Sequence, residues 1–273
     1  MTLYVSDLDG TLLNNDAQVS EISKKLLNKV LNNNTNFTIA TARTPATISQ
    51  LLDGIDIKLP VISMNGSTIY DFKKEEYIYY NKLPTSIVSK LNKIINSETV
   101  QAFIYTIKDN YLTVYHNKLV NPYEISFYNQ RSDRKKYKNF IESPLPPNSE
   151  VLFFAIIDSE DKLNKLYEKI KDIPNISIAK YRDAYNYEIF YLEIYDINST
   201  KSNAIKYLKH EYNFNEVISF GDNLNDIPMF NISDACYAVN NAVHELKEIS
   251  TGVIGSNIED SVSKFIYYKS LFL

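Results

Sequence analysis

The N-terminal third of the chain alternates between apolar runs and amphipathic stretches. The apolar runs predict three short strands, at residues 3–5, 37–40 and 60–64. Between the first two, residues 20–31 carry apolar side chains at helical spacing, and Ser20 is placed to cap that helix. A second helix is expected to start at Pro45, because proline favours the first helical turn. Asn65-Gly66, directly after the third strand, predicts a tight turn and a hairpin.

The last third of the chain returns to the same alternation. It predicts strands at residues 190–195, 217–220 and 236–239, and helices at residues 201–212, 242–248 and 259–268. Strand–helix alternation at both ends of a chain is typical of an α/β fold with one parallel, doubly wound sheet. We therefore predict a Rossmann-like catalytic core assembled from residues 1–82 and 188–273.

The middle of the chain has a different character. Residues 83–187 are rich in Tyr and Lys and mix strand patterns with helix patterns, which predicts an inserted α+β cap domain that sets substrate specificity. Where this insertion rejoins the core, we expect residues 185–187 to contact the substrate. A basic run in the insertion favours a solvated loop over contact with an anionic substrate tail. The run consists of Arg131, Arg134, Lys135, Lys136 and Lys138.

Composition narrows the class of protein and of partner. The chain has 273 residues, 44% of them hydrophobic and 23% charged, which is enough for a sizeable buried core. A formal net charge of −4 provides no overall attraction to nucleic acid or anionic membranes, so we expect neither as a partner. No apolar run approaches the roughly 20 residues of a membrane span, and no basic leader precedes the first strand. These features predict a cytoplasmic protein, and they do not specify an oligomeric state.

Polar side chains follow the strands that we expect in the core sheet. In open parallel sheets, ligands bind beyond the carboxyl ends of the strands. The residues that the pattern brings to this edge are Asp7, Asp9, Gly10, Thr41, Ala42, Arg43, Asn65, Lys201, Asp222, Asn225 and Asp226. We therefore predict that they form one active site.

The residue types indicate phosphoryl chemistry. Asp7, Asp9 and Asp222 would repel one another in one pocket, and a hard divalent cation with oxygen ligands, such as Mg²⁺, would relieve that repulsion. Thr41 and Lys201 can donate hydrogen bonds to phosphoryl oxygens. A carboxylate beside them can attack phosphorus to give an aspartyl-phosphate, and a second carboxyl group can protonate the leaving alcohol and later activate water.

Four motifs, in order along the chain, resemble those of the haloacid dehalogenase superfamily. The run from Asp7 to Leu12, DLDGTL, resembles the first motif, DxDGT. Thr41 resembles the second-motif hydroxyl residue, Lys201 resembles the third-motif lysine, and residues 221–226 resemble the fourth motif, GDxxND. The place and size of the insertion, and the Asn-Gly turn after the third strand, are similar to Cof-like phosphatases with a C2-type cap.

The resemblance implies Mg²⁺-dependent hydrolysis of phosphate monoesters of small metabolites, such as sugar phosphates, through an aspartyl-phosphate. It implies that Asp7 is the nucleophile and a metal ligand, and that Asp9 is the acid/base whose main-chain carbonyl also binds Mg²⁺. Asp222 would be the third protein ligand, and Asp226 would hold metal-bound water or Lys201. The groups implied to bind phosphate or substrate are Gly10, Thr41, Ala42, Arg43, Asn65, Lys201 and Asn225.

Some alternatives stay open at this stage. Phosphoryl transfer to a second hydroxyl is one alternative, as in the phosphomannomutases that share this cap type. A non-catalytic phosphometabolite-binding regulator that keeps the fold is another. For Arg43, the sequence permits a surface ion pair or contact with the site, and Asn65 can be a turn residue as well as a pocket wall. Ala42 and Ser202 stand where the superfamily often has glycine, which affects how closely phosphate approaches the backbone near Ala42.

Overall fold

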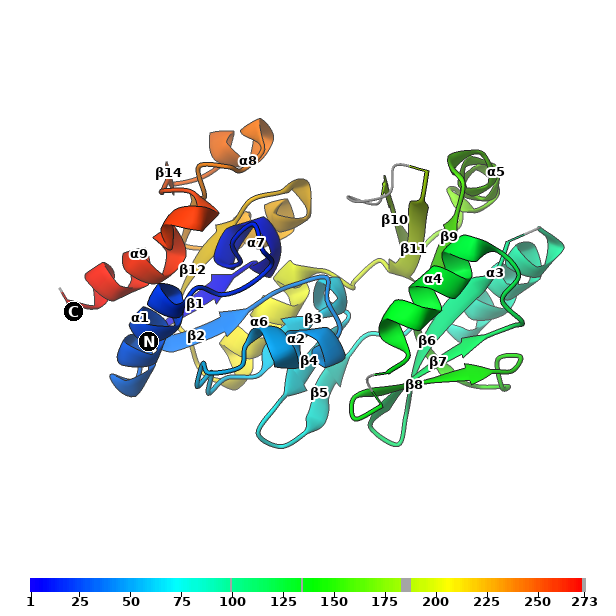
Figure 1. The fold of residues 1–273 in the computed structure, drawn as a ribbon, viewed down its shortest axis with the longest axis horizontal. Helices are drawn as coiled ribbons and strands as arrows, with labels where there is room; N and C mark the ends of the chain where they lie inside the picture. The colour runs from blue at the N-terminus through cyan, green and yellow to red at the C-terminus, as the bar shows by residue number, and fades with distance from the viewer. Residues whose placement is uncertain (99, 134, 183–187, 272–273) are drawn as a thin grey trace. The chain divides into compact units, whose positions relative to one another are not determined.

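The chain folds into two compact units (Figure 1). The computed structural model describes residues 1–98, 100–133, 135–182 and 188–271. The core unit comprises Met1–Tyr79 and Thr200–Leu273, and the inserted unit comprises Tyr80–Ser199. Each unit has its own sheet, as the α/β core with an α+β insertion predicts.

A five-stranded parallel sheet forms the centre of the core unit, in the order β14-β13-β12-β1-β2. Its strands are β1 (Thr2–Ser6), β2 (Asn36–Ile39), β12 (Glu216–Gly221), β13 (Ala235–Ala238) and β14 (Gly252–Val253). Leu3, Val217 and Phe220 are fully buried, because a parallel sheet covered on both faces needs apolar strands. Since β1 pairs with both β2 and β12, the residue that follows β1 lies in the interior of the carboxyl edge.

The core helices begin close to where the sequence predicts. They are α1 (Glu21–Asn32), α2 (Pro45–Leu51), α6 (Lys201–Glu211), α7 (Ile227–Phe230), α8 (His244–Glu248) and α9 (Ser261–Ser270). Ser20 caps α1, because its side chain accepts a hydrogen bond from the N–H of Ser23. Pro45 is the first residue of α2, as expected of a proline at a helix start.

The predicted hairpin after the third strand is present. Strands β3 (Val61–Ser63) and β4 (Thr68–Asp71) pair antiparallel around the turn Met64–Gly66, and β5 (Glu76–Tyr80) completes a three-stranded sheet. Gly66 has a φ of 88°, and a Cβ there would lie 2.2 Å from the carbonyl oxygen of Thr200. Only glycine therefore lets this turn pack against the start of α6.

The inserted unit contains a six-stranded sheet in the order β10-β11-β9-β6-β7-β8. Its strands are β6 (Ala102–Lys108), β7 (Tyr111–His116), β8 (Lys138–Glu142), β9 (Glu150–Asp158), β10 (Ile176–Arg182) and β11 (Phe190–Asp196). Helices α3 (Thr85–Ser97) and α5 (Glu160–Ile170) cover one face with an aliphatic core. Helix α4 (Pro122–Arg131) packs on the other face, where Phe127 contacts Phe103 and Tyr191.

The predicted boundary between the insertion and the second part of the core is wrong, because β11 lies on the other side of it. We expected residues 190–195 in the core sheet, but β11 pairs antiparallel with β9 and β10 and belongs to the inserted unit. The inserted unit therefore extends to Ser199. The physical reason is visible in the strand, whose aliphatic residues alternate with Tyr and Glu. Such alternation is typical of an antiparallel strand with two different faces.

The prediction that the basic run forms a solvated loop is also wrong in part. Arg131 lies in the last turn of α4, and Lys138 is a buried residue of β8 with its ammonium group over the Phe140 ring. Arg134 lies outside the described residues. Long basic side chains can bury their aliphatic stems, so a charge run does not by itself predict a loop. Among the helices of the described ranges, none is long and apolar enough to cross a membrane.

Candidate active site at the carboxyl edge of the core sheet

Asp7 is fixed at the end of β1. Its backbone N–H donates to the carbonyl of Phe220 over 2.9 Å, and the residue is only 5% exposed. The chain then continues through the tight turn Leu8–Leu12, in which Gly10 has a φ of 72°. A Cβ at Gly10 would lie 2.4 Å from Oδ2 of Asp222, so glycine allows the turn to pass directly beside that carboxylate.

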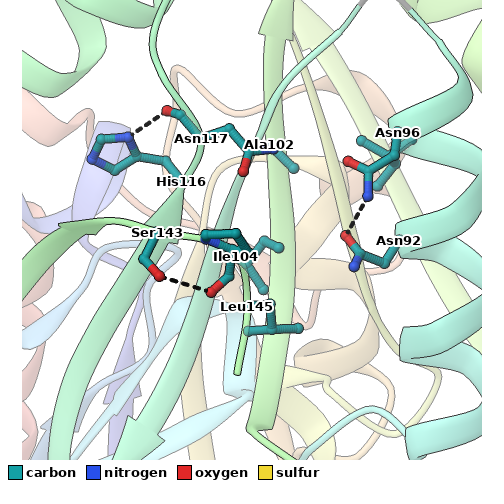
Figure 2. Close-up of a pocket in the computed structure, with 10 residues that line it drawn as sticks. Asn92, Asn96, Ala102, Ile104, His116, Asn117, Ser143 and Leu145 are labelled. Carbon is teal, nitrogen blue, oxygen red and sulfur yellow. Dashed lines mark hydrogen bonds between the residues drawn. The ribbon is translucent and has the colours of Figure 1, made fainter. Parts of the chain in front are cut away.

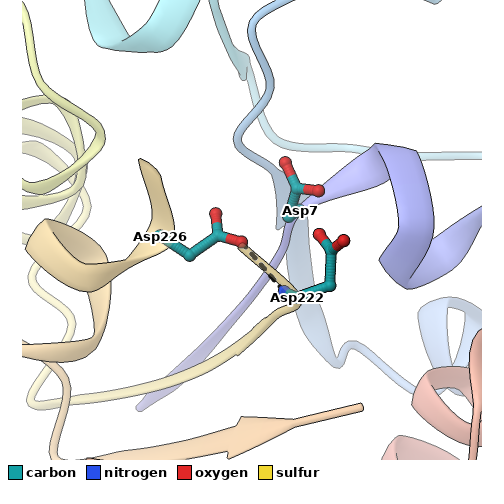
Figure 3. A group of neighbouring side chains, drawn as sticks. All are labelled: Asp7, Asp222 and Asp226. Atoms are coloured by element: carbon teal, nitrogen blue, oxygen red, sulfur yellow. Dashed lines mark hydrogen bonds between the residues drawn. The ribbon is translucent and has the colours of Figure 1, made fainter. Parts of the chain in front are cut away.

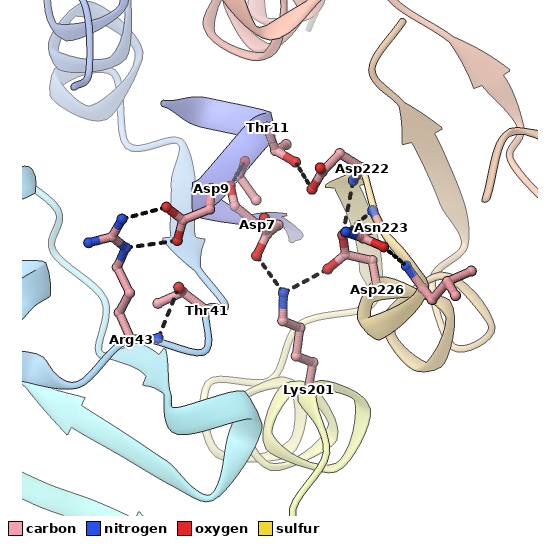
Figure 4. A network of polar contacts seen from close by, with 11 residues as sticks. Asp7, Asp9, Thr11, Thr41, Arg43, Lys201, Asp222, Asn223 and Asp226 are labelled. Carbon is pink, nitrogen blue, oxygen red and sulfur yellow. Dashed lines mark hydrogen bonds and ion pairs between the residues drawn. The ribbon is translucent and has the colours of Figure 1, made fainter. Parts of the chain in front are cut away.

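Lys201 provides the cation of the site. It is the first residue of α6, a helix that Thr200 caps by accepting a hydrogen bond from the N–H of Asn203. Its Nζ lies 2.5 Å from Oδ1 of Asp7 and 2.7 Å from Oδ1 of Asp226 (Figure 4). Burial alone lowers the pKa of Lys201, but the two carboxylates raise it above its ordinary value. The side chain is therefore a permanent ammonium group.

Asp226 is held from two sides. Its Oδ2 accepts from the backbone N–H groups of Asp222 and Asn223 over 2.9 and 3.2 Å, while its Oδ1 accepts from Lys201. A Cβ at Gly221 would lie 2.6 Å from Oδ2 of Asp226. The loop after β12 thus curls around this fully buried carboxylate, which orients Lys201 toward Asp7.

Three carboxylates form a cluster that could hold a metal ion. One oxygen each from Asp7, Asp222 and Asp226 lies within 4.8 Å of the others (Figure 3). Burial raises the pKa of Asp7 well above its ordinary range, and burial together with Asp226 raises that of Asp222 to about 6. With Lys201 as the cation, the ionised group carries a formal charge of −2. A divalent cation with oxygen ligands fits that charge and that donor set.

Asp9 points away from this cluster and pairs with Arg43. The guanidinium donates from Nε to Oδ2 over 2.8 Å and from Nη2 to Oδ1 over 2.5 Å (Figure 4). The side chain of Asp9 is 50% exposed and that of Arg43 is 28% exposed. Both interpretations of Arg43 therefore apply together, because its ion-pair partner is itself a predicted site residue. The two parallel hydrogen bonds fix the direction of the Asp9 carboxylate.

The loop after β2 is tied to the Asn-Gly turn. Asn65 donates its N–H to the carbonyl of Thr41, and Met64 donates its N–H to the carbonyl of Arg43. The buried Thr41 hydroxyl accepts from the N–H of Arg43, which leaves its own proton for an acceptor in the site. Oδ1 of Asn65 is buried and accepts no hydrogen bond from the described residues. Ala42 is exposed on the same loop.

Not all predicted site residues take part in this network. The structure brings together Asp7, Lys201, Asp222 and Asp226, and it places Gly10 against Asp222. Asn225 is exposed on the turn after β12, and within the described ranges its side chain makes no hydrogen bond. Residues 185–187, expected to contact the substrate, lie outside the described residues.

Two further residues support the site. The hydroxyl of Thr11 donates to Oδ1 of Asp222 over 3.1 Å. Asn241 donates from Nδ2 to the carbonyl of Gly10 over 2.7 Å, and its Oδ1 accepts from the N–H of Asn257. Neither Thr11 nor Asn241 is among the residues predicted from the sequence to carry a role in the site. The sequence does contain a signal for Asn241, because this polar residue follows β13 at the same edge of the sheet as the other site residues.

A separate pocket lies in the inserted unit (Figure 2). Its lining includes Asn92, Asn96 and Asn117, and the Asn96 amide donates to Oδ1 of Asn92 over 3.4 Å. No carboxylate or ammonium group lines this pocket. We therefore assign the chemistry to the core unit.

Comparison with known proteins agrees with the motifs. The sequence profile of a family described as haloacid dehalogenase-like hydrolase matches residues 4–266. The chain is 27% identical to 5-amino-6-(5-phospho-D-ribitylamino)uracil phosphatase YwtE of Bacillus subtilis, with 97% of each chain covered.

Solved structures show the same fold at lower identity. A haloacid dehalogenase-like hydrolase from Bacteroides thetaiotaomicron matches with a TM-score of 0.78 at 21% identity, covering 98% of this chain and 99% of the other. The subclass IIB sugar phosphatase BT4131 matches with a TM-score of 0.73 at 21% identity, covering 99% and 100%. With the profile match extending over nearly the whole sequence, this chain belongs to the haloacid dehalogenase-like hydrolases.

Proposed function

We propose that this chain is a Mg²⁺-dependent phosphatase that hydrolyses phosphate monoesters of small metabolites through an aspartyl-phosphate on Asp7. The observation that carries the proposal is the buried ion-pair network, in which Lys201 joins Asp7 to Asp226 beside Asp222. It combines a nucleophile, a fixed cation and a net negative charge suited to a divalent metal ion. Several relatives that match the whole chain are named phosphatases.

The first step forms a bond between Asp7 and phosphorus. Lys201 holds one oxygen of Asp7 and leaves the other to attack, while its ammonium group and the Thr41 hydroxyl can donate to phosphoryl oxygens. The P–O bond to the leaving alcohol breaks, and Asp9 donates the proton that the alcohol needs. Asp7, Asp222 and the main-chain carbonyl of Asp9 would hold Mg²⁺, which would supply positive charge beside the phosphoryl group.

The second step returns the enzyme to its starting state. Asp9, now a carboxylate, takes a proton from water, whose oxygen attacks phosphorus and displaces the Asp7 carboxylate. Inorganic phosphate leaves. Both oxygens of Asp9 accept from Arg43 in the structure, so protonation of Asp9 would weaken its ion pair with the guanidinium.

The organic part of the substrate belongs to this proposal as well. The Bacillus relative is named for a substrate with a phosphorylated ribityl chain, and BT4131 is described as a sugar phosphatase. Both names place the phosphate on a polyhydroxylated carbon chain. We infer that the substrate of this chain carries its phosphate on such a chain.

The test is phosphate release from a panel of phosphate monoesters, with Mg²⁺ and with a chelator. Wild-type protein should release phosphate only with metal, and Asp7→Asn should abolish release because an amide cannot form the acyl phosphate. Asp16→Asn, the same change at an exposed position of the core unit, is the matched control and should keep full activity. Isomerised sugar phosphate without free phosphate would indicate a mutase instead. Binding without turnover would indicate a regulator.

A further inference from the structure

The pocket of the inserted unit lies on the helix-covered face of its sheet (Figure 2). Helices α3 and α5 cover this face. Two packed helices span about 20 Å, whereas six strands span about 24 Å, so part of the face is left without a helix. The pocket opens between α3, β6 and the loop 143–145 that follows β8. All of its lining residues belong to the inserted unit.

Buried apolar side chains form the inner part of the pocket. Ile95 of α3, together with Ala102 and Ile104 of β6, lines it, and each is at most 7% exposed. Leu145, in the loop after β8, packs against the same aliphatic core. The N–H of Ser143 donates to the carbonyl of the last residue of β7 over 3.0 Å, which ties this loop to the sheet. Because both walls are fixed to the sheet, a ligand would find the pocket preformed.

Three side-chain amides line the same pocket. Asn92 and Asn96 are one helical turn apart on α3 and therefore lie on the same side of the helix, while Asn117 directly follows β7. Nδ2 of Asn96 donates to Oδ1 of Asn92 over 3.4 Å, and Nδ2 of Asn117 donates to Oε1 of Gln101 over 3.2 Å. Within the described ranges, no residue bonds to Nδ2 of Asn92 or to Oδ1 of Asn96 and of Asn117. The pocket thus offers both donors and acceptors to a ligand.

The lining indicates the charge and polarity of the ligand. No charged side chain of the described residues lines the pocket, so it has no partner for an anion or a cation. A wholly apolar ligand would take water from the amides without replacing its hydrogen bonds. A hydroxyl group donates and accepts, so it can pair with either end of an amide.

The size and the apolar inner part favour a ring. The pocket has a volume of about 420 Å³ including its open mouth, within the roughly 300–1,000 Å³ of small-molecule sites. A sugar ring carries hydroxyl groups at its edge and C–H groups on its faces. One face can pack on Ile104 and Leu145 while the hydroxyl groups reach the amides.

We propose that this pocket, lined by Asn92, Asn96 and Asn117, binds a neutral monosaccharide. The inference does not rest on the proposed function, because no residue of the core unit takes part in it. A sugar phosphate, the substrate class proposed for the core unit, is disfavoured here for lack of a cation. The dephosphorylated sugar that such a reaction releases is of the class that the pocket would take.

Titration with D-glucose tests the pocket through its own amide groups. Side-chain amide signals in ¹H–¹⁵N NMR spectra of the full chain can be assigned by replacing one asparagine at a time with alanine. We expect the signals of Asn92, Asn96 and Asn117 to shift and saturate with D-glucose. The signal of Asn139, an exposed residue of β8 in the same sheet, should not shift.

Variants measure the contribution of single amides. Asn92→Ala should raise the Kd for D-glucose about fivefold, because one hydrogen bond is lost. Asn139→Ala is the matched control and should leave the Kd within about twofold. If thermal unfolding shows that Asn92→Ala does not fold, Asn117→Ala, at an exposed position after β7, serves in its place with the same expected change.

Three outcomes would overturn the inference. The first is the absence of a saturable shift at Asn92, Asn96 and Asn117 in wild-type protein. The second is an equal Kd in wild type, Asn92→Ala and Asn117→Ala. The third is an equal response to cyclohexanol, which lacks the further hydroxyl groups, or to D-glucuronate, which adds a negative charge.

The catalytic variant separates this inference from the proposed function. Asp7→Asn should bind D-glucose in the pocket with an unchanged Kd while it releases no phosphate, because the pocket lies in the inserted unit. Wild-type protein that binds D-glucose but hydrolyses no ester would contradict the proposed function alone. Hydrolysis without any shift of the three amide signals would contradict this inference alone.

Discussion

At the scale of single residues, the site depends on close approaches that only particular side chains allow. Gly10 and Gly221 lie so close to Asp222 and Asp226 that a Cβ at either position would overlap a carboxylate. These glycines let two loops meet around three acids, and Lys201 then offsets part of the charge. The positions of the carboxylates therefore depend on the paths of the two loops. A shift of the backbone at Gly10 or Gly221 would move the carboxylate oxygens of the site.

The close approach at Gly10 is testable with a matched glycine. Gly10→Ala should lower kcat at least tenfold, because its Cβ would displace the Asp222 carboxylate, from which it would lie 2.4 Å. Gly54→Ala is the control, since Gly54 also has a positive φ, of 82°, but its nearest neighbour lies 3.7 Å away. Both variants should lose about 1–2 kcal/mol in urea unfolding from the left-handed backbone. Equal activity of the two variants would contradict the argument.

The raised pKa of Asp222 predicts a pH dependence of metal binding. Because its pKa of about 6 lies above the ordinary value, the metal-free carboxyl is protonated below that pH and ionised above it. Protons therefore compete with Mg²⁺, and the rise in Tm that Mg²⁺ causes should shrink as the pH falls through about 6. Thermal unfolding with and without Mg²⁺, from pH 5 to pH 8, measures this. A Mg²⁺ effect that stays constant over the range would count against Asp222 as a ligand.

At the scale of elements, the sequence predicts the core better than the insertion. The short buried strands of the core sheet are continuous apolar runs, and reading the polar residues that follow them locates Asp7, Thr41 and Asp222. Strand β11 is wrongly predicted as a core strand, because its place along the chain suits the core while its alternation of residues suits the antiparallel sheet of the inserted unit. Helix α4 and strands β8 and β10 were not predicted, because aromatic and basic residues obscure their periodicity.

Side-chain pairing could be predicted only in part: the resemblance implies contact between Asp226 and Lys201, which is present over 2.7 Å. The sequence indicates that Arg43 and Asp9 both lie at the sheet edge, but the bidentate ion pair between them depends on the directions of two loops. The same holds for the cluster, in which the side chain of Asp226 joins Asp7 and Asp222 while that of Asp9 does not. Strand order determines which loops lie close together. The packing of those loops determines which side-chain atoms come into contact.

The loop after β13 anchors the turn at Gly10, and this anchoring can be tested. Asn241 connects the Gly10 carbonyl to the N–H of Asn257, so it holds the turn that carries Asp9. Asn241→Ala should lower kcat about tenfold with a smaller effect on KM, because the turn that carries Asp9 loses one anchor while Thr41 and Lys201 stay in place. Asn240→Ala, at the exposed neighbouring position, should behave as wild type. A loss of activity in both variants would indicate general damage to the loop.

At the scale of the whole molecule, the site joins two stretches of sequence that more than 100 residues separate. Strand β1 pairs with β12 in a register that aligns Thr2 with Glu216 and Ser6 with Phe220. This pairing alone brings Asp7 beside Asp222, and Lys201 enters from the first helix after the insertion. The acids of the cluster therefore all come from the core unit, and the insertion only separates them along the sequence.

This division predicts where Mg²⁺ acts. All three carboxylates of the cluster belong to the core unit, so metal binding should slow backbone hydrogen exchange in the loops after β1 and β12. Exchange in β9 of the inserted unit should not change, because that strand contributes no ligand. Exchange followed by mass spectrometry with and without Mg²⁺ measures both, and Asp7→Asn should remove the effect in the core loops. Equal protection of β9 would show that metal binding is linked to the inserted unit, which contradicts a site confined to the core.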